Sequence, residues 1–304
     1  MSISLLLVQT LNGLQLGILL YLTAAGVTLV LSIMNFISLA HGSFYMMGAY
    51  FAATTYNHTG SFLLAGIAGT GGVFALGILT ERLTLTSLYE RGHLDQVLCT
   101  FGLILFFNEV ARMIWGATPY YMEIPDQFSG IVDVLGVPYP MYRFIITLAG
   151  ILIAAGLWLL IHRTRLGMLI RAGATNREMI AALGVNIRLL NTLLFGLSAA
   201  LAGFSGFLVA PILSVQSGMG DYVLVMTLVV IIIGGIGSIR GAFFAALIVG
   251  LVDTIGRIFL PVVFENLVET SLAQAAAPAI SSMLIYVLMV AILAFRPLGL
   301  FRAQ

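Results

Sequence analysis

Five arginines gather in one short segment of a chain that otherwise carries few charges, and they are well suited to binding a partner. They are Arg163, Arg165, Arg171, Arg177 and Arg188, with Glu178 as the one acidic residue among them. Long apolar segments flank them. Arginine-rich loops between apolar segments face the cytoplasm in membrane proteins. Residues 163–189 are therefore expected to form a cytoplasmic loop that docks another protein, with binding to anionic lipid as the alternative.

The interior of this loop has the composition of a short helix. Arg171–Asn186 is rich in alanine, and the pattern predicts one helix that ends at Gly184, because glycine commonly terminates helices. Ala181 and Ala182 follow Glu178 at helical spacing and leave a surface of small side chains that a partner groove could accept. The expected partner contacts are Arg171, Arg177, Glu178, Ala181, Ala182 and Gly184.

Two polar interruptions of apolar sequence could border a solute path. One runs from Asn35 to Ser43, and the other is the glycine-rich run from Gly234 to Gly241. A helix that is broken at membrane depth leaves backbone groups that lipid cannot satisfy, so such a segment faces protein or a water-filled path. The expected path residues are Asn35, Ser38, His41, Gly42, Gly234, Gly235, Gly237 and Ser238. Tight turns between membrane spans are the alternative explanation.

The chain shows no catalytic or nucleotide-binding set. It contains no lysine, so the lysine-containing phosphate loop of ATP-binding proteins cannot be present. The four histidines are scattered and lack metal-ligand spacing. Two acid–arginine pairs, Glu109 with Arg112 and Asp253 with Arg257, are expected at membrane edges, and no acidic residue is expected in the middle of a span. We expect no cofactor on this chain; if transport is driven by ATP, then ATP and Mg would be used by partner subunits.

The composition requires a lipid bilayer around most of these segments. Of the 304 residues, 61% are apolar and 8% are charged, whereas soluble domains carry roughly 25% charged residues. Nine spans are expected, within a range of eight to ten, near residues 10–33, 42–56, 61–80, 96–116, 143–162, 190–213, 222–233, 242–252 and 278–295. Residues 81–95 are placed in the cytoplasm and 253–269 outside. The alternation of basic and acidic loops predicts the N-terminus outside and the C-terminus inside.

The expected fold class is therefore an all-α, polytopic transmembrane bundle with glycine-interrupted segments, organised as a single domain over residues 1–304. Four of its segments together resemble the membrane subunit of bacterial branched-chain amino acid ABC importers, the LivH/LivM-type permease family. They are Leu11–Gly17, the region from Met34 through Gly42 to Tyr50, Arg171–Asn186 and Gly234–Gly241, in family-like order and spacing. Pro297–Phe301 is similar to the family's usual ending. The chain departs from the family at Ser43, where an acidic residue is common, and in a less acidic opening of the coupling helix.

The resemblance implies a permease subunit of the bacterial inner membrane. Such a subunit pairs with a second permease subunit, identical or different, and with two cytoplasmic ATPase subunits, and it receives solute from an extracytoplasmic binding protein. It implies that Arg171–Asn186 contacts the ATPases and that the two polar interruptions border the path. We expect import of branched-chain or other small amino acids by alternating access. Urea or short amides are the alternative solutes, a self-sufficient channel or secondary carrier is the alternative class, and no nucleic-acid partner is expected.

Overall fold

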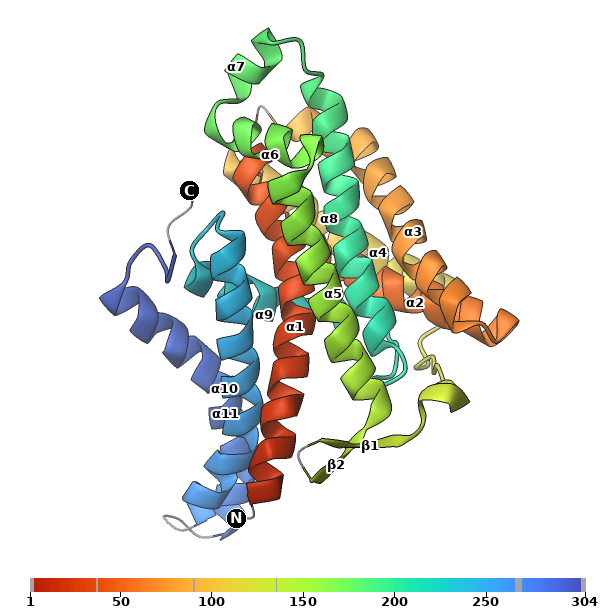
Figure 1. Cartoon of the computed structure of the whole chain (residues 1–304), viewed down its shortest axis with the longest axis vertical. Helices are drawn as coiled ribbons and strands as arrows, with labels where there is room; N and C mark the ends of the chain where they lie inside the picture. Colours follow the sequence, from red (N-terminus) through yellow and green to blue (C-terminus); the bar gives the residue numbers. More distant parts are fainter. Residues whose placement is uncertain (1–2, 37, 90, 135, 266–269, 302–304) are drawn as a thin grey trace. The chain divides into compact units, whose positions relative to one another are not determined.

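The computed structural model describes residues 3–36, 38–89, 91–134, 136–265 and 270–301, most of which are α-helical (Figure 1). The longer helices in these ranges are α1 (Ile3–Met34), α2 (His41–Thr59), α3 (Phe62–Thr80), α4 (His93–Trp115), α5 (Met141–Arg163), α8 (Ile187–Val209), α9 (Met219–Gly234), α10 (Ile239–Glu265) and α11 (Thr270–Phe295). Two short helices, α6 (Arg165–Thr175) and α7 (Arg177–Ala182), separate α5 from α8. A small antiparallel hairpin, β1 (Ile131–Val134) and β2 (Val137–Pro140), precedes α5.

Each expected span falls on one of the longer helices. Within the described ranges, six helical segments are long and apolar enough to cross a membrane: α1, α3 with its continuation to Leu88, α4, α5, α8 and α10. This confirms the all-α class. The apolar helices α9 and Ala279–Phe295 are shorter. The count of nine crossings and the orientation of the termini stay predictions.

The chain divides into two compact units, which are described separately. One comprises Met1–Tyr21, Asp126–Gly150 and Thr227–Gln304, and the other comprises Leu22–Pro125 and Ile151–Met226. We call the first the α10 unit and the second the α8 unit.

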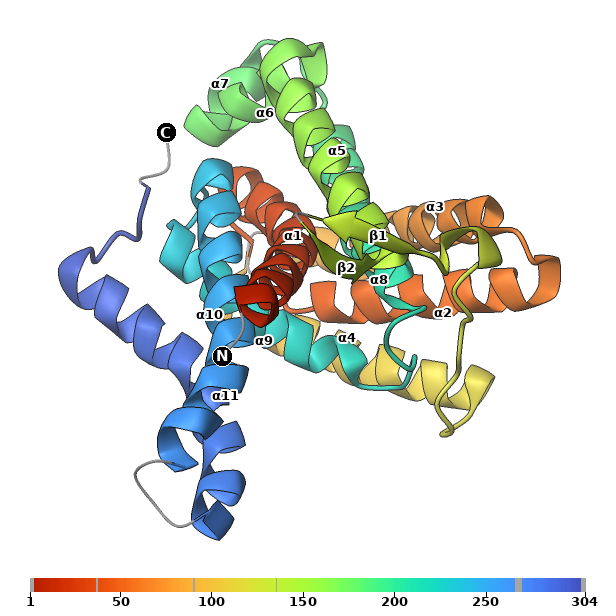
Figure 2. The ribbon, with the colours of Figure 1, turned by 60° about the horizontal axis from the view of Figure 1, so that its bottom comes forward.

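Three glycines allow the central helices of the α8 unit to touch through their backbones. Helices α2, α3 and α8 lie side by side there (Figures 1 and 2). A Cβ atom on Gly48 would overlap the backbone of Gly203, and one on Gly203 would lie 2.9 Å from the carbonyl oxygen of Gly69. A Cβ on Gly69 would in turn lie 3.0 Å from the carbonyl oxygen of Gly48. Membrane helices that approach this closely gain packing contacts in place of the hydrophobic driving force that lipid does not supply.

In the α10 unit, α10 packs against the first half of α1 and against α11. A Cβ on Gly13 would lie 2.9 Å from the Cα of Leu251, and one on Gly17 would lie 2.8 Å from the carbonyl oxygen of Ala246. On the α11 side, the Ser281 hydroxyl donates to the Gly256 carbonyl at 3.2 Å. The opening motif Leu11–Gly17 therefore has a structural role, since its glycines bring α1 onto α10.

Two acidic residues lie where the sequence placed loops. The helix that begins as α3 continues past Thr80 through a π-helical turn at Glu81–Leu85 and a 3₁₀ turn at Thr86–Leu88, so Glu81 is helical and only 1% exposed. Helix α10 continues through Asp253, which is 3% exposed, instead of ending before it. The expectations that a polar loop begins at residue 81 and that the apolar helix ends before residue 253 were therefore wrong, while the side of the membrane on which residues 253–269 lie stays a prediction. Both carboxylates lie within helical segments that are long and apolar enough to cross a membrane, and their depth in the bilayer stays a prediction.

Both expected ion pairs form. Arg257 Nε lies 2.9 Å from Asp253 Oδ2, and Arg112 Nη1 lies 2.9 Å from Glu109 Oε1. The second pair is exposed on both sides, so it contributes little to stability. In the other pair, Arg257 donates two hydrogen bonds to the buried carboxylate of Asp253. These bonds offset part of the cost of removing that charge from water.

Candidate solute path and partner surface

The break between α1 and α2 is a non-helical linker whose polar side chains differ in their burial. Asn35 follows the last residue of α1, has a φ of 48° and is exposed. Asparagine adopts this left-handed conformation more readily than most other non-glycine residues, which explains its place at the break. Ser38 is 1% exposed and His41 is fully buried at the start of α2. The structure therefore brings Ser38 and His41 into the interior and leaves Asn35 at the surface.

His41 joins this break to α8. Its Nε2 lies 2.5 Å from the Ser198 hydroxyl oxygen, and its ring packs edge-on against Phe44 and Phe195. The hydroxyls of Ser38 and Ser43 are buried and have no hydrogen-bond partner among the described residues. Buried polar groups are usually hydrogen-bonded, so these two hydroxyls are exceptions, and their role in a path stays a prediction.

Sequence reasoning missed two polar residues of α8 on the side that meets His41. Asn191, Phe195 and Ser198 lie at positions i, i+4 and i+7, so they share one face of the helix. Asn191 is 1% exposed, and its Oδ1 has no hydrogen-bond partner among the described residues. The helical spacing of these polar residues in an apolar span was a signal that could have identified them. It could not have identified their contact with His41, because Ser198 lies 157 positions further along the chain.

Gly42 has a packing role. A Cβ on it would lie 2.5 Å from the carbonyl oxygen of Gly220 and 2.9 Å from the Cβ of Leu224. The first turns of α2 and α9 therefore touch through their backbones within the α8 unit. Any side chain at residue 42 would separate them.

The glycine-rich run Gly234–Gly241 is a closed turn between α9 and α10. Gly235 and Gly237 have φ values of 99° and 83°, a backbone conformation that residues other than glycine rarely adopt. The Ser238 hydroxyl accepts the Gly241 N–H at 3.1 Å and so caps α10. The backbone N–H groups of Leu300 and Phe301 donate to the carbonyls of Ile233 and Gly234 at 2.8 and 3.1 Å. The C-terminal segment thus packs directly on the turn, as expected for a tight connection, and the suggested role of Gly234, Gly235, Gly237 and Ser238 in a path stays a prediction.

The arginine-rich loop forms two helices where one was expected. Asn176 separates α6 from α7, and its Oδ1 accepts the N–H of Met179 at 3.0 Å. The chain cannot continue α6 through Asn176, because this residue has the extended backbone of an N-cap. Gly184, with a φ of 84°, follows the last turn of α7, where a helix-terminating glycine was expected.

The inner face of this loop packs on the helices that surround the break. A Cβ on Gly173 would lie 3.5 Å from Ile33 Cγ2 on α1, 3.9 Å from Ile180 and 4.0 Å from Leu190 on α8. Ile180 and Leu190 are each 5% exposed. Arg171 donates from Nη1 to the Ile161 carbonyl in the last turn of α5, a position where a cation also favours the helix dipole. The loop is therefore attached to α1, α5 and α8.

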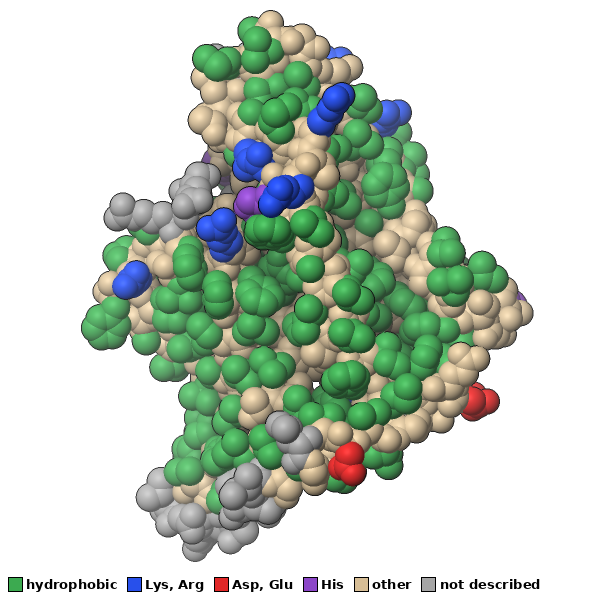
Figure 3. Space-filling view, in the orientation of Figure 1, with side chains coloured by type: hydrophobic (Ala, Val, Ile, Leu, Met, Phe, Trp, Pro, Cys, Tyr) green, Lys and Arg blue, Asp and Glu red, His purple; other side chains and the backbone are tan. Residues whose placement is uncertain are grey.

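The outer face of the loop is apolar and small. Met179 on α7 is 62% exposed, and Leu183, which caps the C-terminal end of α7 one turn later, is 77% exposed, with Ala181 and Ala182 exposed beside them. The side chains of Arg177 and Glu178 lie outside those that the structure describes. Figure 3 shows arginine side chains gathered over α6 and the adjoining end of α5. Exposed apolar side chains bordered by cations are typical of a protein-binding surface.

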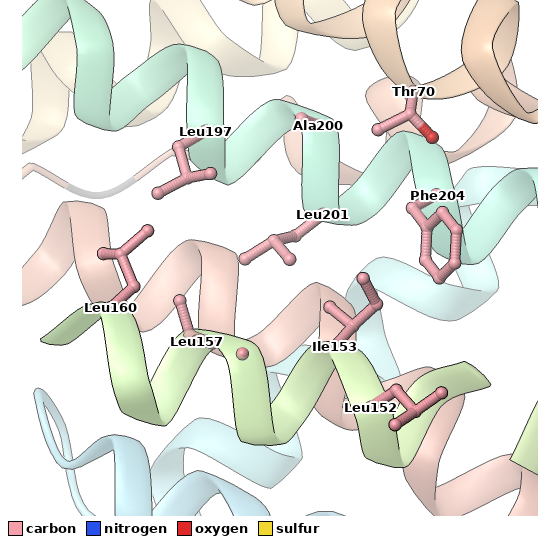
Figure 4. Close-up of a pocket in the computed structure, with 10 residues that line it drawn as sticks. Thr70, Leu152, Ile153, Leu157, Leu160, Leu197, Ala200, Leu201 and Phe204 are labelled. Atoms are coloured by element: carbon pink, nitrogen blue, oxygen red, sulfur yellow. The ribbon is translucent and has the colours of Figure 1, made fainter. Parts of the chain in front are cut away.

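A cavity of about 250 Å³ between α5 and α8 is unsuited to a polar solute (Figure 4). Its lining consists of Thr70, Leu152, Ile153, Gly156, Leu157, Leu160, Leu197, Ala200, Leu201 and Phe204. An amide or hydroxyl that entered it would lose hydrogen bonds to water with little replacement. The cavity is therefore not part of the candidate path. Nor do the described residues contain a cluster of three or more His, Cys, Asp or Glu side chains that could hold a metal ion.

Near α5, the opening motif supplies a hydrogen-bond acceptor. Asn12 Oδ1 accepts from Arg143 Nη1 at 2.8 Å and from the Tyr139 hydroxyl at 3.1 Å. Burial raises the pKa of the Tyr139 phenol, and the Arg143 guanidinium acts in the opposite direction. The contact ties the hairpin and the start of α5 to α1 within the α10 unit.

Comparison with known proteins gives matches along most of the chain. The family model described as the permease component of the branched-chain amino acid transport system matches residues 9–293. The chain is 30% identical over 261 residues to the high-affinity branched-chain amino acid transport system permease protein BraD of Pseudomonas aeruginosa, across 82% of this chain and 85% of that protein. It is 26% identical over 288 residues to the permease protein LivH of Escherichia coli K12, across 87% and 90% of the two chains.

A sugar permease is also among the relatives. The ribose import permease protein RbsC of Escherichia coli K12 is 26% identical over 242 residues, across 76% of this chain and 72% of that protein. No solved structure gives a significant match.

Proposed function

The chain belongs to the family of branched-chain amino acid transport permeases, and from that premise we propose that it carries a small amino acid inward when partner ATPases move its α6–α7 loop. As a member of this family it is a multi-pass membrane subunit of an ABC-type transporter and is not itself catalytic. ATP and Mg are bound by two cytoplasmic ATPase subunits. A second permease subunit completes the membrane channel, and an extracytoplasmic binding protein delivers the solute.

One observation carries this proposal above all. The α6–α7 loop exposes Met179 and Leu183 on its outer face, while its inner face packs on Ile33 and Leu190. Movement of a partner that is bound to the outer face would therefore displace α1 at the residues before the break and α8 at its first turn. Such a connection suits alternating access, in which the ATPases act on the path from a distance.

The solute path proposed here passes the break beside α8. Ser38, His41, Ser198 and Asn191 offer neutral hydrogen-bonding groups and no fixed charge, which suits a small polar solute without net charge. Branched-chain amino acids are the first candidates because two relatives are named for them. A pentose is the second candidate, because one relative is a ribose permease and hydroxyl groups would find the same partners.

The proposal is tested by reconstituting the chain with its ATPases, second permease and binding protein in sealed vesicles. Arg171→Ala and Glu178→Ala should each lower solute uptake and solute-stimulated ATP hydrolysis while membrane insertion stays normal. Arg171 would act by holding α6 on α5, and Glu178 by contact with the ATPase. The control is Arg296→Ala, outside the loop. Normal uptake by both loop variants, or purification of the active chain without ATPase subunits, would contradict the proposal.

A further inference from the structure

The first charged residue of the sequence is buried in the α8 unit and has no cationic partner among the side chains that the structure describes. Glu81 is 1% exposed, and neither ion pair of the described residues involves it. Tyr89 donates its hydroxyl to Glu81 Oε1 at 2.5 Å, and Thr192 donates to Oε2 at 2.8 Å. Thr86 lies 3.5 Å from Oε1. Removing a carboxylate from water costs free energy unless such donors compensate it. Only 8% of the residues of this chain are charged, so a buried carboxylate is an unusual feature of it.

The helix departs from regular geometry at the same residue. The π-helical turn Glu81–Leu85 inserts one residue into the turn and is followed by a 3₁₀ turn. The Thr86 hydroxyl donates to the Glu81 carbonyl at 2.9 Å. Turns of this kind are rare and often occur at functional sites. Here the turn directs the Glu81 carboxylate toward α8 and leaves Tyr89 within reach of its other oxygen.

The two donors link Glu81 to the two parts of the proposed machinery. Thr192 lies in the second turn of α8, and the N-cap residue of this helix, Asn186, follows directly from the α6–α7 loop. The Tyr89 ring packs edge-on against Phe36, with centroids 5.7 Å apart, and Phe36 is fully buried in the break after Asn35. One carboxylate thus connects the helix moved by the loop with the segment that borders the solute path.

We propose that Glu81 is a positioning residue that transmits displacement of the α6–α7 loop from α8, through Thr192, to Tyr89 and the break at Asn35–His41. The inference rests on the proposed function, since it assumes that ATPases move the loop. A carboxylate suits this role because its two oxygens accept from both donors at once, and hydrogen bonds to a charged acceptor are about twice as strong as neutral ones. Through this link, displacement of the loop can reach the break without direct contact between the two.

The test compares coupling in the complete transporter, reconstituted with its ATPases, second permease and binding protein in vesicles. Thr192→Val and Tyr89→Phe each remove one donor with little change in shape, and Glu81→Gln keeps the shape but removes the charge. Each variant should lower the number of solutes imported per ATP hydrolysed about tenfold, the size expected for one lost hydrogen bond to a charged group. ATP hydrolysis itself should stay within about twofold of the parent, because the ATPase contact is intact.

The matched control is Thr100→Val. Thr100 is fully buried in the same unit, and within the described part of the chain its hydroxyl bonds only to the backbone of its own helix, at Gln96 and Val97. The ratio of import to hydrolysis should therefore not change. The double variant Glu81→Gln with Thr192→Val should have a ratio of import to hydrolysis no lower than that of the poorer single variant, because both substitutions remove the same interaction.

An unchanged ratio in Thr192→Val and Tyr89→Phe would overturn the proposal even if Glu81→Gln failed to fold. A parallel fall of import and hydrolysis together with lower thermal stability would also overturn it, because that pattern marks a purely structural role. If the parent assembly showed no solute-dependent ATP hydrolysis, the proposed function itself would fail instead.

Discussion

At the scale of single residues, the absence of a side chain sets how closely the helices of the α8 unit pack. A Cβ on Gly48 would overlap the Gly203 backbone, whereas a Cβ on Gly71 would have nothing within 4 Å, although both residues lie inside helices. Gly48→Ala should therefore destabilise the protein by about 1–3 kcal/mol, as overpacking does. The measurement is thermal unfolding of the purified protein in detergent.

Gly71→Ala is the matched control, since the exchange is the same and only the space differs. It should leave stability unchanged or raise it by up to about 1 kcal/mol, because alanine favours a helix over glycine. Equal melting temperatures for the two variants would show that α2 and α8 are not held in backbone contact at Gly48.

Residue types alone indicated some of these sites and not others. Asn35 was recognisable as a polar residue in an apolar run and Gly184 as a helix-terminating glycine, and both have a positive φ. The burial of Glu81 was not, because the Thr192 hydroxyl that satisfies it lies 111 positions away. The packing of Gly42 was not recognisable either, since its neighbour Gly220 comes from a distant segment, and its place beside a path stays a prediction. Contacts between distant segments leave no local pattern.

At the scale of elements, apolar runs were sufficient to locate the helices but not to find where they end. Charged residues suggested ends at Glu81 and Asp253, yet both helices continue, because a hydroxyl cluster and an arginine one turn away satisfy those carboxylates. The reverse error occurred in the arginine-rich loop. Asn176 there is a good N-cap type, but an alanine-rich context favoured an uninterrupted helix.

The division into α6 and α7 gives the loop two faces that can be altered separately. Met179→Ser and Leu183→Ser change exposed side chains, so they should leave the melting temperature of the purified chain unchanged and lower co-purification with the ATPase subunits by about tenfold or more, as for side chains central to an interface. Ile180→Ser changes a side chain that is 5% exposed and should lower stability by about 2 kcal/mol or more. The readouts are affinity purification through a tagged ATPase and thermal unfolding.

That contrast separates docking from folding of the loop. If Met179→Ser and Leu183→Ser kept full ATPase binding, the outer face of α7 would not be the partner surface. If they lowered the melting temperature as much as Ile180→Ser does, the two side chains would be needed for folding of the loop. Their effect on ATPase binding would then not identify a docking surface.

At the scale of the whole molecule, charge distribution predicts which loops face the ATPases. The loop from Arg163 to Arg188 holds five arginines, while residues 116–140 hold three acids and no arginine. Since arginine-rich loops stay in the cytoplasm, the α6–α7 loop and the segment after α11 should lie inside and the β1–β2 region outside. The single cysteine, Cys99, makes this testable with few changes.

In a Cys99→Ala background, an impermeant maleimide applied to intact cells should label Gln127→Cys and not Ala181→Cys or Leu298→Cys. Each of these three positions is exposed, so a lack of labelling would reflect its side of the membrane and not burial. Labelling of the last two after permeabilisation is the internal control. External labelling of Ala181→Cys would invert the orientation and remove the α6–α7 loop from the reach of cytoplasmic ATPases, whereas external labelling of Leu298→Cys alone would change the number of crossings after α8 and leave the docking surface in place.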